Sequence, residues 1–117
     1  MTTETKHPGA QPFVALENAI EIVASLRSVV SVVRRQDADL ARQIVRSASS
    51  IGANVAEGNG RQGKDRLHHF RISAGSAEET RAHLRIAIAW GWLRAEDVSA
   101  AMALIDRQLR LLWGLTH

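Results

Sequence analysis

Hydrophobic residues recur along the chain at intervals of three and four, with polar residues between them. The first run is Phe13, Leu16, Ile20, Val23, Leu26, Val30 and Val33. This spacing puts the apolar side chains on one helical face, so it predicts a helix over residues 13–35. Both prolines of the chain lie in residues 1–12. We therefore predict a disordered N-terminal tail over residues 1–12 and a single domain over residues 13–117.

The same periodicity predicts helices over about residues 38–57, from residue 66 to near residue 91, and from about residue 95 onward. Asp37 and Asp65 directly precede two of these helices and are the expected N-caps. The chain shows no alternating strand pattern and no internal repeat. Four helices of roughly 20 to 27 residues joined by short loops predict an all-α, antiparallel, up-and-down four-helix bundle.

Some apolar residues lie beside the main stripes. Val29 and Val32 do so in the first helix, and Leu104, Leu111 and Trp113 in the last. A helix with a second apolar face needs a second surface to cover that face, which favours assembly as a homo-oligomer. The alternative is that a broad stripe belongs to the core of a small bundle.

Glycines interrupt the second and third predicted helices. A glycine inside a helix costs about 1 kcal/mol of stability relative to alanine. We therefore expect Gly52 and Gly75 each to allow a favourable contact that offsets this cost. We interpret them as the points where these two helices pack closely. Gly58 and Gly60 are expected to supply the positive φ that ends the second helix.

Asn54 and Glu57 lie one turn apart near the end of the second helix. We interpret them as a polar clasp, in which Asn54 bonds across to the third helix and Glu57 pairs with Arg61 or Arg71. A catalytic role is disfavoured because no nucleophile or metal-ligand set accompanies them.

Composition excludes several classes of protein. The absence of cysteine rules out a disulfide framework and a thiolate zinc site. No segment approaches the roughly 18 uninterrupted apolar residues of a membrane span, and the N-terminus has no apolar signal core. We expect a cytoplasmic protein with no membrane partner and no cofactor.

Positive charge is concentrated in one stretch of the chain. Residues 27–71 carry nine Lys and Arg against four Asp and Glu, whereas the whole chain has a net charge of +3. The expected phosphate-binding residues are Arg34, Arg35, Arg42, Arg46, Arg61 and Lys64. The alternative is that these cations form surface ion pairs with Asp39, Glu57 and Asp65.

Histidines raise the question of a metal. Glu79 and His83 are i, i+4 neighbours on one helical face, and His68 and His69 lie nearer the start of that helix. Zinc needs three or four ligands, so a solvated or interface role is favoured and no metal site is predicted.

Two segments carry a family resemblance. "RQIVRSASSIGANVAEGNGR" and "HHFRISAGSAEETRAHLRIA" resemble the four helix bundle proteins encoded in intervening sequences of large-subunit ribosomal RNA genes. The accessory protein of diversity-generating retroelements is similar. The resemblance implies a four-helix protomer, a ring-like homopentamer and no known catalytic activity. In the retroelement branch it also implies binding of nucleic acid and of a reverse transcriptase on a basic surface.

Together these observations predict a non-enzymatic, oligomeric helical scaffold that binds RNA or DNA through a basic surface, with a reverse transcriptase as one candidate partner. The alternative is a structural or protein-binding assembly with no nucleic-acid role. An enzyme with a histidine and carboxylate metal site is the least favoured hypothesis.

Overall fold

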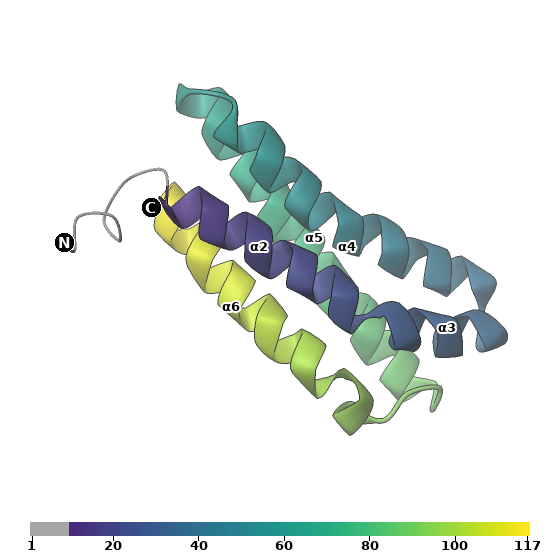
Figure 1. The fold of residues 1–117 in the computed structure, drawn as a ribbon. Helices are drawn as coiled ribbons and strands as arrows, with labels where there is room; N and C mark the ends of the chain where they lie inside the picture. Colours follow the sequence, from purple (N-terminus) through teal and green to yellow (C-terminus); the bar gives the residue numbers. More distant parts are fainter. Residues whose placement is uncertain (1–9) are drawn as a thin grey trace.

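The computed structural model describes the backbone of residues 10–117 and the side chains from residue 13 onward. In this range the chain forms five α-helices: α2 (Ala10–Ser25), α3 (Arg27–Gln36), α4 (Ala38–Asn59), α5 (Gly63–Ala89) and α6 (Ser99–Thr116) (Figure 1). A short 3-10 turn, η1 (Ala95–Val98), precedes α6, and residues 10–117 contain no strand. None of the described helices is long and apolar enough to cross a membrane.

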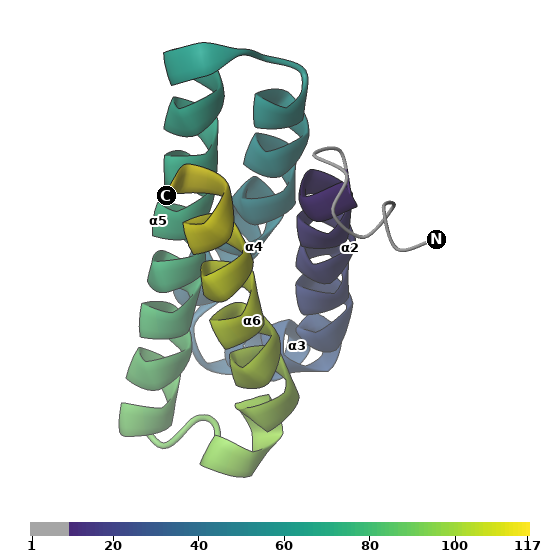
Figure 2. The same ribbon diagram turned by 90° about the vertical axis from the view of Figure 1, so that its left-hand side faces the viewer.

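The helices form a four-cornered bundle. α4 and α5 run side by side along most of their length, α2 packs against α4 and α6, and α5 packs against α6. In the view of Figure 2, α5 and α2 lie on different sides of the bundle. The all-α prediction is confirmed, but the count of four helices is not, because the first predicted helix is divided into α2 and α3. Most of the predicted tail lies outside the described residues, and α2 already begins at Ala10.

The division between α2 and α3 falls at Leu26. The Leu26 N–H donates to the Val23 carbonyl at 3.1 Å. This acceptor lies three residues earlier in the chain, whereas the acceptor in a regular α-helix lies four residues earlier. The Ser25 hydroxyl donates to the Ile22 carbonyl at 2.7 Å. A side chain that bonds to the backbone in this way competes with the helical ladder and bends the helix. Neither glycine nor proline marks this point, so periodicity alone predicted one helix over residues 13–35.

Asp37 caps α4 as predicted. Its Oδ1 accepts from the N–H groups of Asp39 at 3.0 Å and Leu40 at 3.1 Å. The cap predicted for the next helix is wrong, because α5 begins at Gly63 and Asp65 lies within its first turn. Asp65 is instead engaged by a neighbouring arginine, as described below.

Positive φ occurs at two described glycines, Gly63 (61°) and Gly91 (82°). Gly91 follows the end of α5, where the third predicted helix was expected to stop. The prediction for Gly58 and Gly60 is wrong: Gly58 lies inside α4, and Gly60 has a φ of −87°. α4 therefore runs two residues beyond the predicted end, to Asn59.

The core is apolar apart from a few hydrogen-bonded side chains. One polar pair joins α2 to α6, where Asn18 and Gln108 are both fully buried. The Asn18 amide donates to Gln108 Oε1 at 2.8 Å and to the Leu104 carbonyl at 2.9 Å. Arg107 donates to Asn18 Oδ1 at 3.0 Å. This network fixes how α2 and α6 face each other.

Candidate nucleic-acid interface

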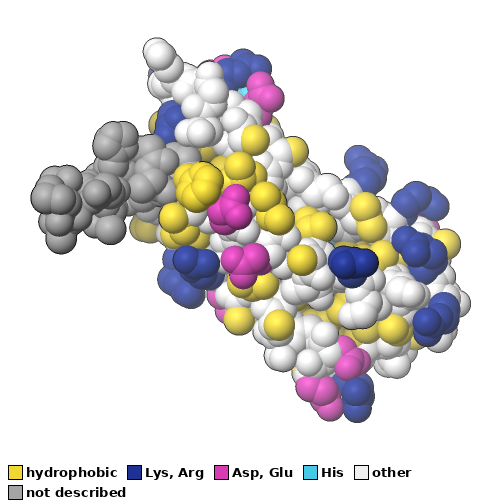
Figure 3. Space-filling view, in the orientation of Figure 1, with side chains coloured by type: hydrophobic (Ala, Val, Ile, Leu, Met, Phe, Trp, Pro, Cys, Tyr) yellow, Lys and Arg dark blue, Asp and Glu magenta, His cyan; other side chains and the backbone are white. Residues whose placement is uncertain are grey.

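Exposed arginines gather along α3 and the first part of α4, a region that we call the basic end (Figure 3). They are Arg27, Arg34, Arg35, Arg42 and Arg46, and all five are exposed. Within residues 13–117, Arg42 makes an ion pair, with Asp39, and the other four make none. Guanidinium groups without a carboxylate partner remain available to phosphate oxygens.

Helical geometry explains this grouping. Arg42 and Arg46 are one turn apart on α4, so they lie on the same outer face. Arg34 and Arg35 occupy the last turn of α3, where positive charge also suits the helix dipole. Arg27 and Arg34 line a groove of about 280 Å³ between α3 and α4.

A second groove runs between α4 and α5, and we call it the α4–α5 groove. It has a volume of about 330 Å³ and is lined by Asp39, Arg42, Gln43, Arg46, Ser47, Ser50, Ser76 and Glu79. Two arginines and two carboxylates, those of Asp39 and Glu79, balance each other in charge, and the serine hydroxyls provide neutral donors and acceptors. The groove is therefore polar without a net positive charge, and the unpaired arginines of the basic end lie beside it.

The hydroxyls form a row between the two helices. Ser76 donates to Ser50 Oγ at 2.9 Å, and Thr80 donates to Ser47 Oγ at 2.8 Å. Deeper in the interface the Ser73 hydroxyl donates to the Ile51 carbonyl at 2.7 Å. These serines were not among the site residues predicted from sequence. Their recurrence at helical spacing on both helices was the signal for this polar row.

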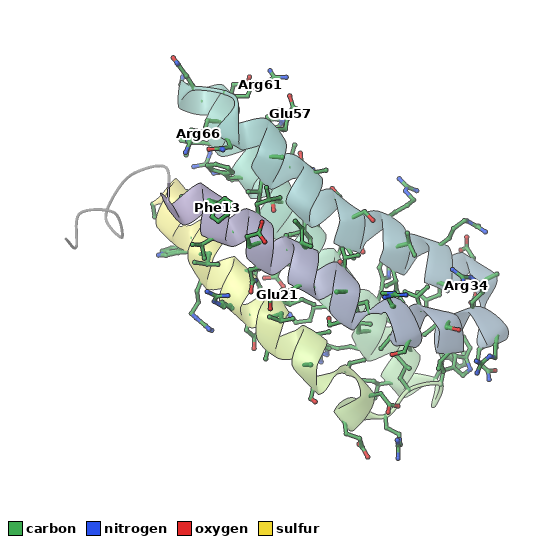
Figure 4. All side chains as sticks on the ribbon, viewed as in Figure 1. Phe13, Glu21, Arg34, Glu57, Arg61 and Arg66 are labelled. Atoms are coloured by element: carbon green, nitrogen blue, oxygen red, sulfur yellow. The ribbon has the colours of Figure 1, made fainter. Side chains whose placement is uncertain are left out.

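Arg61 follows the end of α4 and Lys64 lies in the first turn of α5, at the opposite end of α4 from the basic end. Figure 4 shows Arg61 far from Arg34. Arg61 donates to Glu57 Oε2 at 2.6 Å and to Asp65 Oδ2 at 2.7 Å. These hydrogen bonds, first that to Glu57 and then that to Asp65, raise the pKa of the Arg61 guanidinium, which is exposed to solvent. The structure therefore brings together four of the six predicted phosphate-binding residues and separates Arg61 and Lys64 from them.

The polar clasp is present as predicted. Asn54 Oδ1 lies 3.1 Å from His69 Nδ1 on α5, and Glu57 pairs with Arg61. The Asn54 amide also donates to Ser50 Oγ at 2.9 Å, which connects the clasp to the hydroxyl row.

The glycines have different neighbours from those predicted. A Cβ on Gly52 would lie 3.4 Å from the Ala19 Cβ, so Gly52 faces α2 and not α5. Gly75 is exposed, and nothing lies within 4 Å of a Cβ added there. The α4–α5 contact that needs a glycine is at Gly58, where a Cβ would lie 2.8 Å from the Phe70 ring. The predicted packing roles of Gly52 and Gly75 in this contact are wrong.

Within the described residues, the histidine and carboxylate candidates form no metal site. His83 Nε2 lies 3.2 Å from Glu79 Oε2, and residues 13–117 hold no group of three His, Asp or Glu placed for a metal. Trp90 and Trp92 stack on each other, with ring centroids 5.7 Å apart, at the end of α5.

Comparison with known proteins supports the family resemblance. A crystal structure of a protein of unknown function from the S23 ribosomal protein family of Bacteroides thetaiotaomicron has the same fold. The TM-score is 0.82 at 21% sequence identity, over 91% of this chain and 97% of that one. No curated protein gives a significant match to the chain. The sequence model described as 23S rRNA-intervening sequence protein matches residues 13–114. Because this match spans most of the chain, the protein belongs to the 23S rRNA-intervening sequence protein family.

Proposed function

We propose that the protein is a non-enzymatic, oligomeric scaffold that binds RNA or DNA through the basic end. The observation that carries this proposal is the gathering of five exposed arginines, four of them without a carboxylate partner, along α3 and the first part of α4. Single-stranded nucleic acid presents a phosphate at every nucleotide, and arginines without acidic partners neutralise phosphates with release of counterions.

The surface favours backbone contacts over base recognition. No aromatic side chain on which a base could stack lines either of the two grooves that include arginines of the basic end. We therefore expect the protein to bind nucleic acids with little sequence preference. Assembly as a homopentamer, which the family resemblance implies, would repeat the basic end in each protomer and increase avidity for a long polyanion. A reverse transcriptase is the protein partner that the retroelement branch suggests.

A second candidate function is a structural or protein-binding assembly in which the arginines only face solvent. The exposed apolar side chains favour it. Phe13, Ile20 and Trp113 are 61%, 52% and 64% exposed, which is high for side chains of this size.

Salt-dependent binding of a fluorescently labelled, mixed-sequence RNA of about 40 nucleotides tests the proposal, because the log-log salt slope is about −0.7 per phosphate contact on single strands. The test variant is Arg34→Gln/Arg46→Gln, at the basic end. The matched control is Arg61→Gln/Lys64→Gln, which removes the same charge from the other end of α4.

We expect the test variant to bind about tenfold more weakly at low salt and to have a shallower salt slope, and the control to bind within about twofold of the unmodified protein. Equal losses for the two variants would show that only net charge matters. Absence of RNA and DNA binding at low salt would favour the protein-binding assembly.

A further inference from the structure

Five exposed side chains form one face of α2 that continues onto the start of α3, and we call it the α2 face. Steps of four, three, four and three residues place them on one side of the helix. They are Phe13, Glu17, Ile20, Ala24 and Arg27. Arg27 follows the break at Leu26, but Leu26 keeps helical dihedral angles (φ −98°, ψ −1°), so the face continues across the break.

The centre of the α2 face is apolar. Ile20 and Ala24 occupy it, and Phe13 lies at its outer end. Phe13 and Ile20 are both among the exposed large hydrophobic residues of the described chain. Figure 3 shows hydrophobic side chains exposed over α2, and Figure 4 shows where Phe13 lies on it. One exposed apolar side chain is common, but several along one helix mark a surface that another molecule covers.

An apolar groove between α2 and α4 runs beside the α2 face, and we call it the α2–α4 groove. It has a volume of about 410 Å³ and is lined by Leu16, Ala19, Ile20, Val23, Ser49, Gly52, Ala53 and Ala56. Its floor is low, because a Cβ added to Gly52 would lie 3.4 Å from the Ala19 Cβ. None of the lining residues is charged. Small residues beside an apolar helical face let another helix approach closely.

One charge of each sign flanks the centre of the α2 face. Glu17 precedes Ile20, and Arg27 follows Ala24. Neither Glu17 nor Arg27 makes an ion pair with another described residue. Glu21 lies outside the face: it is three residues after Asn18, whose side chain bonds to α6, so it lies on the flank toward α6.

The spacing of these residues makes the α2 face complementary to itself. Glu17 lies three residues before Ile20, and Arg27 lies three residues after Ala24. When two copies of α2 lie antiparallel with Ile20 of each opposite Ala24 of the other, Glu17 of each copy therefore lies opposite Arg27 of the other. A large apolar side chain then meets a small one, and each exposed charge meets its opposite.

We propose that the α2 face of one copy docks antiparallel on the α2 face of a second copy, about a two-fold axis. In such a contact the same surface serves both copies, so each pairing occurs twice. This inference rests on the oligomeric part of the proposed function and names one of its contacts. A five-membered ring uses a head-to-tail contact through another surface. The particle therefore contains an even number of copies: a dimer, or two rings joined through their α2 faces.

Light scattering coupled to size exclusion tests the contact. Ala24→Arg places a long charged side chain at the centre of the α2 face, and Ala103→Arg on α6 is the matched control. Both positions are exposed, so we expect both variants to keep the helical circular dichroism spectrum of the unmodified protein. We expect the unmodified protein and the control to have the mass of an even number of copies, and Ala24→Arg to have half that mass. An unchanged mass for Ala24→Arg would overturn the docking.

A charge exchange tests the pairing of Glu17 with Arg27. Glu17→Arg and Arg27→Glu each place like charges opposite one another, so each should weaken the association by about tenfold or more. Glu17→Arg/Arg27→Glu restores opposite charges at both pairs and should associate within about threefold of the unmodified protein. A double variant that associates as weakly as the single variants would show that these two residues do not face each other.

The outcomes also separate this inference from the proposed function. If the unmodified protein is monomeric at high concentration, both the docking and the oligomeric part of the proposed function fail. If its particle contains an odd number of copies, the two-fold docking fails and the oligomeric scaffold stands. RNA binding by the basic end is tested with Arg34→Gln/Arg46→Gln, and neither residue belongs to the α2 face.

Discussion

Gly58 is the residue at which α4 and α5 approach most closely among the described glycines. An added Cβ would lie 2.8 Å and 2.9 Å from two carbons of the Phe70 ring and 3.2 Å from the Arg66 carbonyl oxygen. Phe70 is fully buried, and its ring also lies under the Arg66 guanidinium, 4.9 Å from the centroid. The ring therefore has little freedom to move aside.

We expect Gly58→Ala to lower the free energy of unfolding by about 1–3 kcal/mol, because overpacking outweighs the better helix propensity of alanine. Urea denaturation measures the change. Gly114→Ala is the matched control, since nothing lies within 4 Å of a Cβ at this position in α6. A stability equal to or above that of the unmodified protein for Gly58→Ala would contradict the close contact.

Residues were predicted well where the partner lies one or two turns away in sequence. The cap at Asp37 and the pair between Glu57 and Arg61 follow from local spacing alone. The glycines were predicted poorly, because sequence shows that a residue is small but not which helix it faces. Gly52 faces α2, and Gly75 faces outward.

At the scale of the element, apolar periodicity predicted the helices and most of their bounds. It missed the break at Leu26, where the Ser25 hydroxyl and the Leu26 N–H donate to backbone carbonyls three residues earlier, because the apolar residues continue across it. The sequence also gave no sign that α4 continues through Gly58, where glycine serves packing and not termination.

The N-cap of α4 gives a direct prediction. Asp37→Ala removes the acceptor of two backbone N–H groups and should destabilise the protein by about 1 kcal/mol. Asp37→Asn keeps an acceptor and should lose only a few tenths of that amount. Thermal or urea unfolding compares the two, and equal losses would argue against a capping role.

The short turn η1 gives a prediction about pH. The Arg94 N–H donates to Asp97 Oδ2 at 2.8 Å, and the Arg94 guanidinium donates to Oδ1 at 3.2 Å. These bonds lower the pKa of Asp97 in the folded protein. Its stabilising effect is therefore complete above the unfolded-state pKa and is lost as pH falls through the lower folded-state pKa.

We expect the stability difference between the unmodified protein and Asp97→Asn to shrink as pH falls below about 4. NMR titration of the Asp97 carboxyl, compared with the urea-unfolded chain, measures the pKa directly. A folded-state pKa at or above the unfolded value would contradict the hydrogen bonds described here.

At the scale of the whole molecule, the all-α bundle followed from periodicity, and the family followed from the motif on α4 and α5. The candidate site was predicted only in part. Arg42 and Arg46 share a face because they are one turn apart, and α3 brings Arg34 and Arg35 next to them. Arg61 and Lys64 are near α4 in sequence, but the length of that helix separates them from the basic end. Position along a long helix decides which charges act together.

Assembly should make stability depend on concentration. If the chain assembles as proposed, its Tm should rise with protein concentration, because association of folded copies draws the equilibrium toward the folded state. Scanning calorimetry over about a hundredfold range of concentration checks this, and a Tm independent of concentration would contradict the assembly.

The buried pair of Asn18 and Gln108 limits how the last helix can return to the bundle. If α6 slid by one turn against α2, the Asn18 amide would lose its bonds to Gln108 and to the Leu104 carbonyl, at a cost of about 1–3 kcal/mol for each buried group left unsatisfied. A chain cut in the loop between Trp90 and Arg94 would therefore be expected to re-form from its two fragments in a single register. α6 therefore has one favoured register against α2. A split protein divided in this loop should reassemble with α6 in that register.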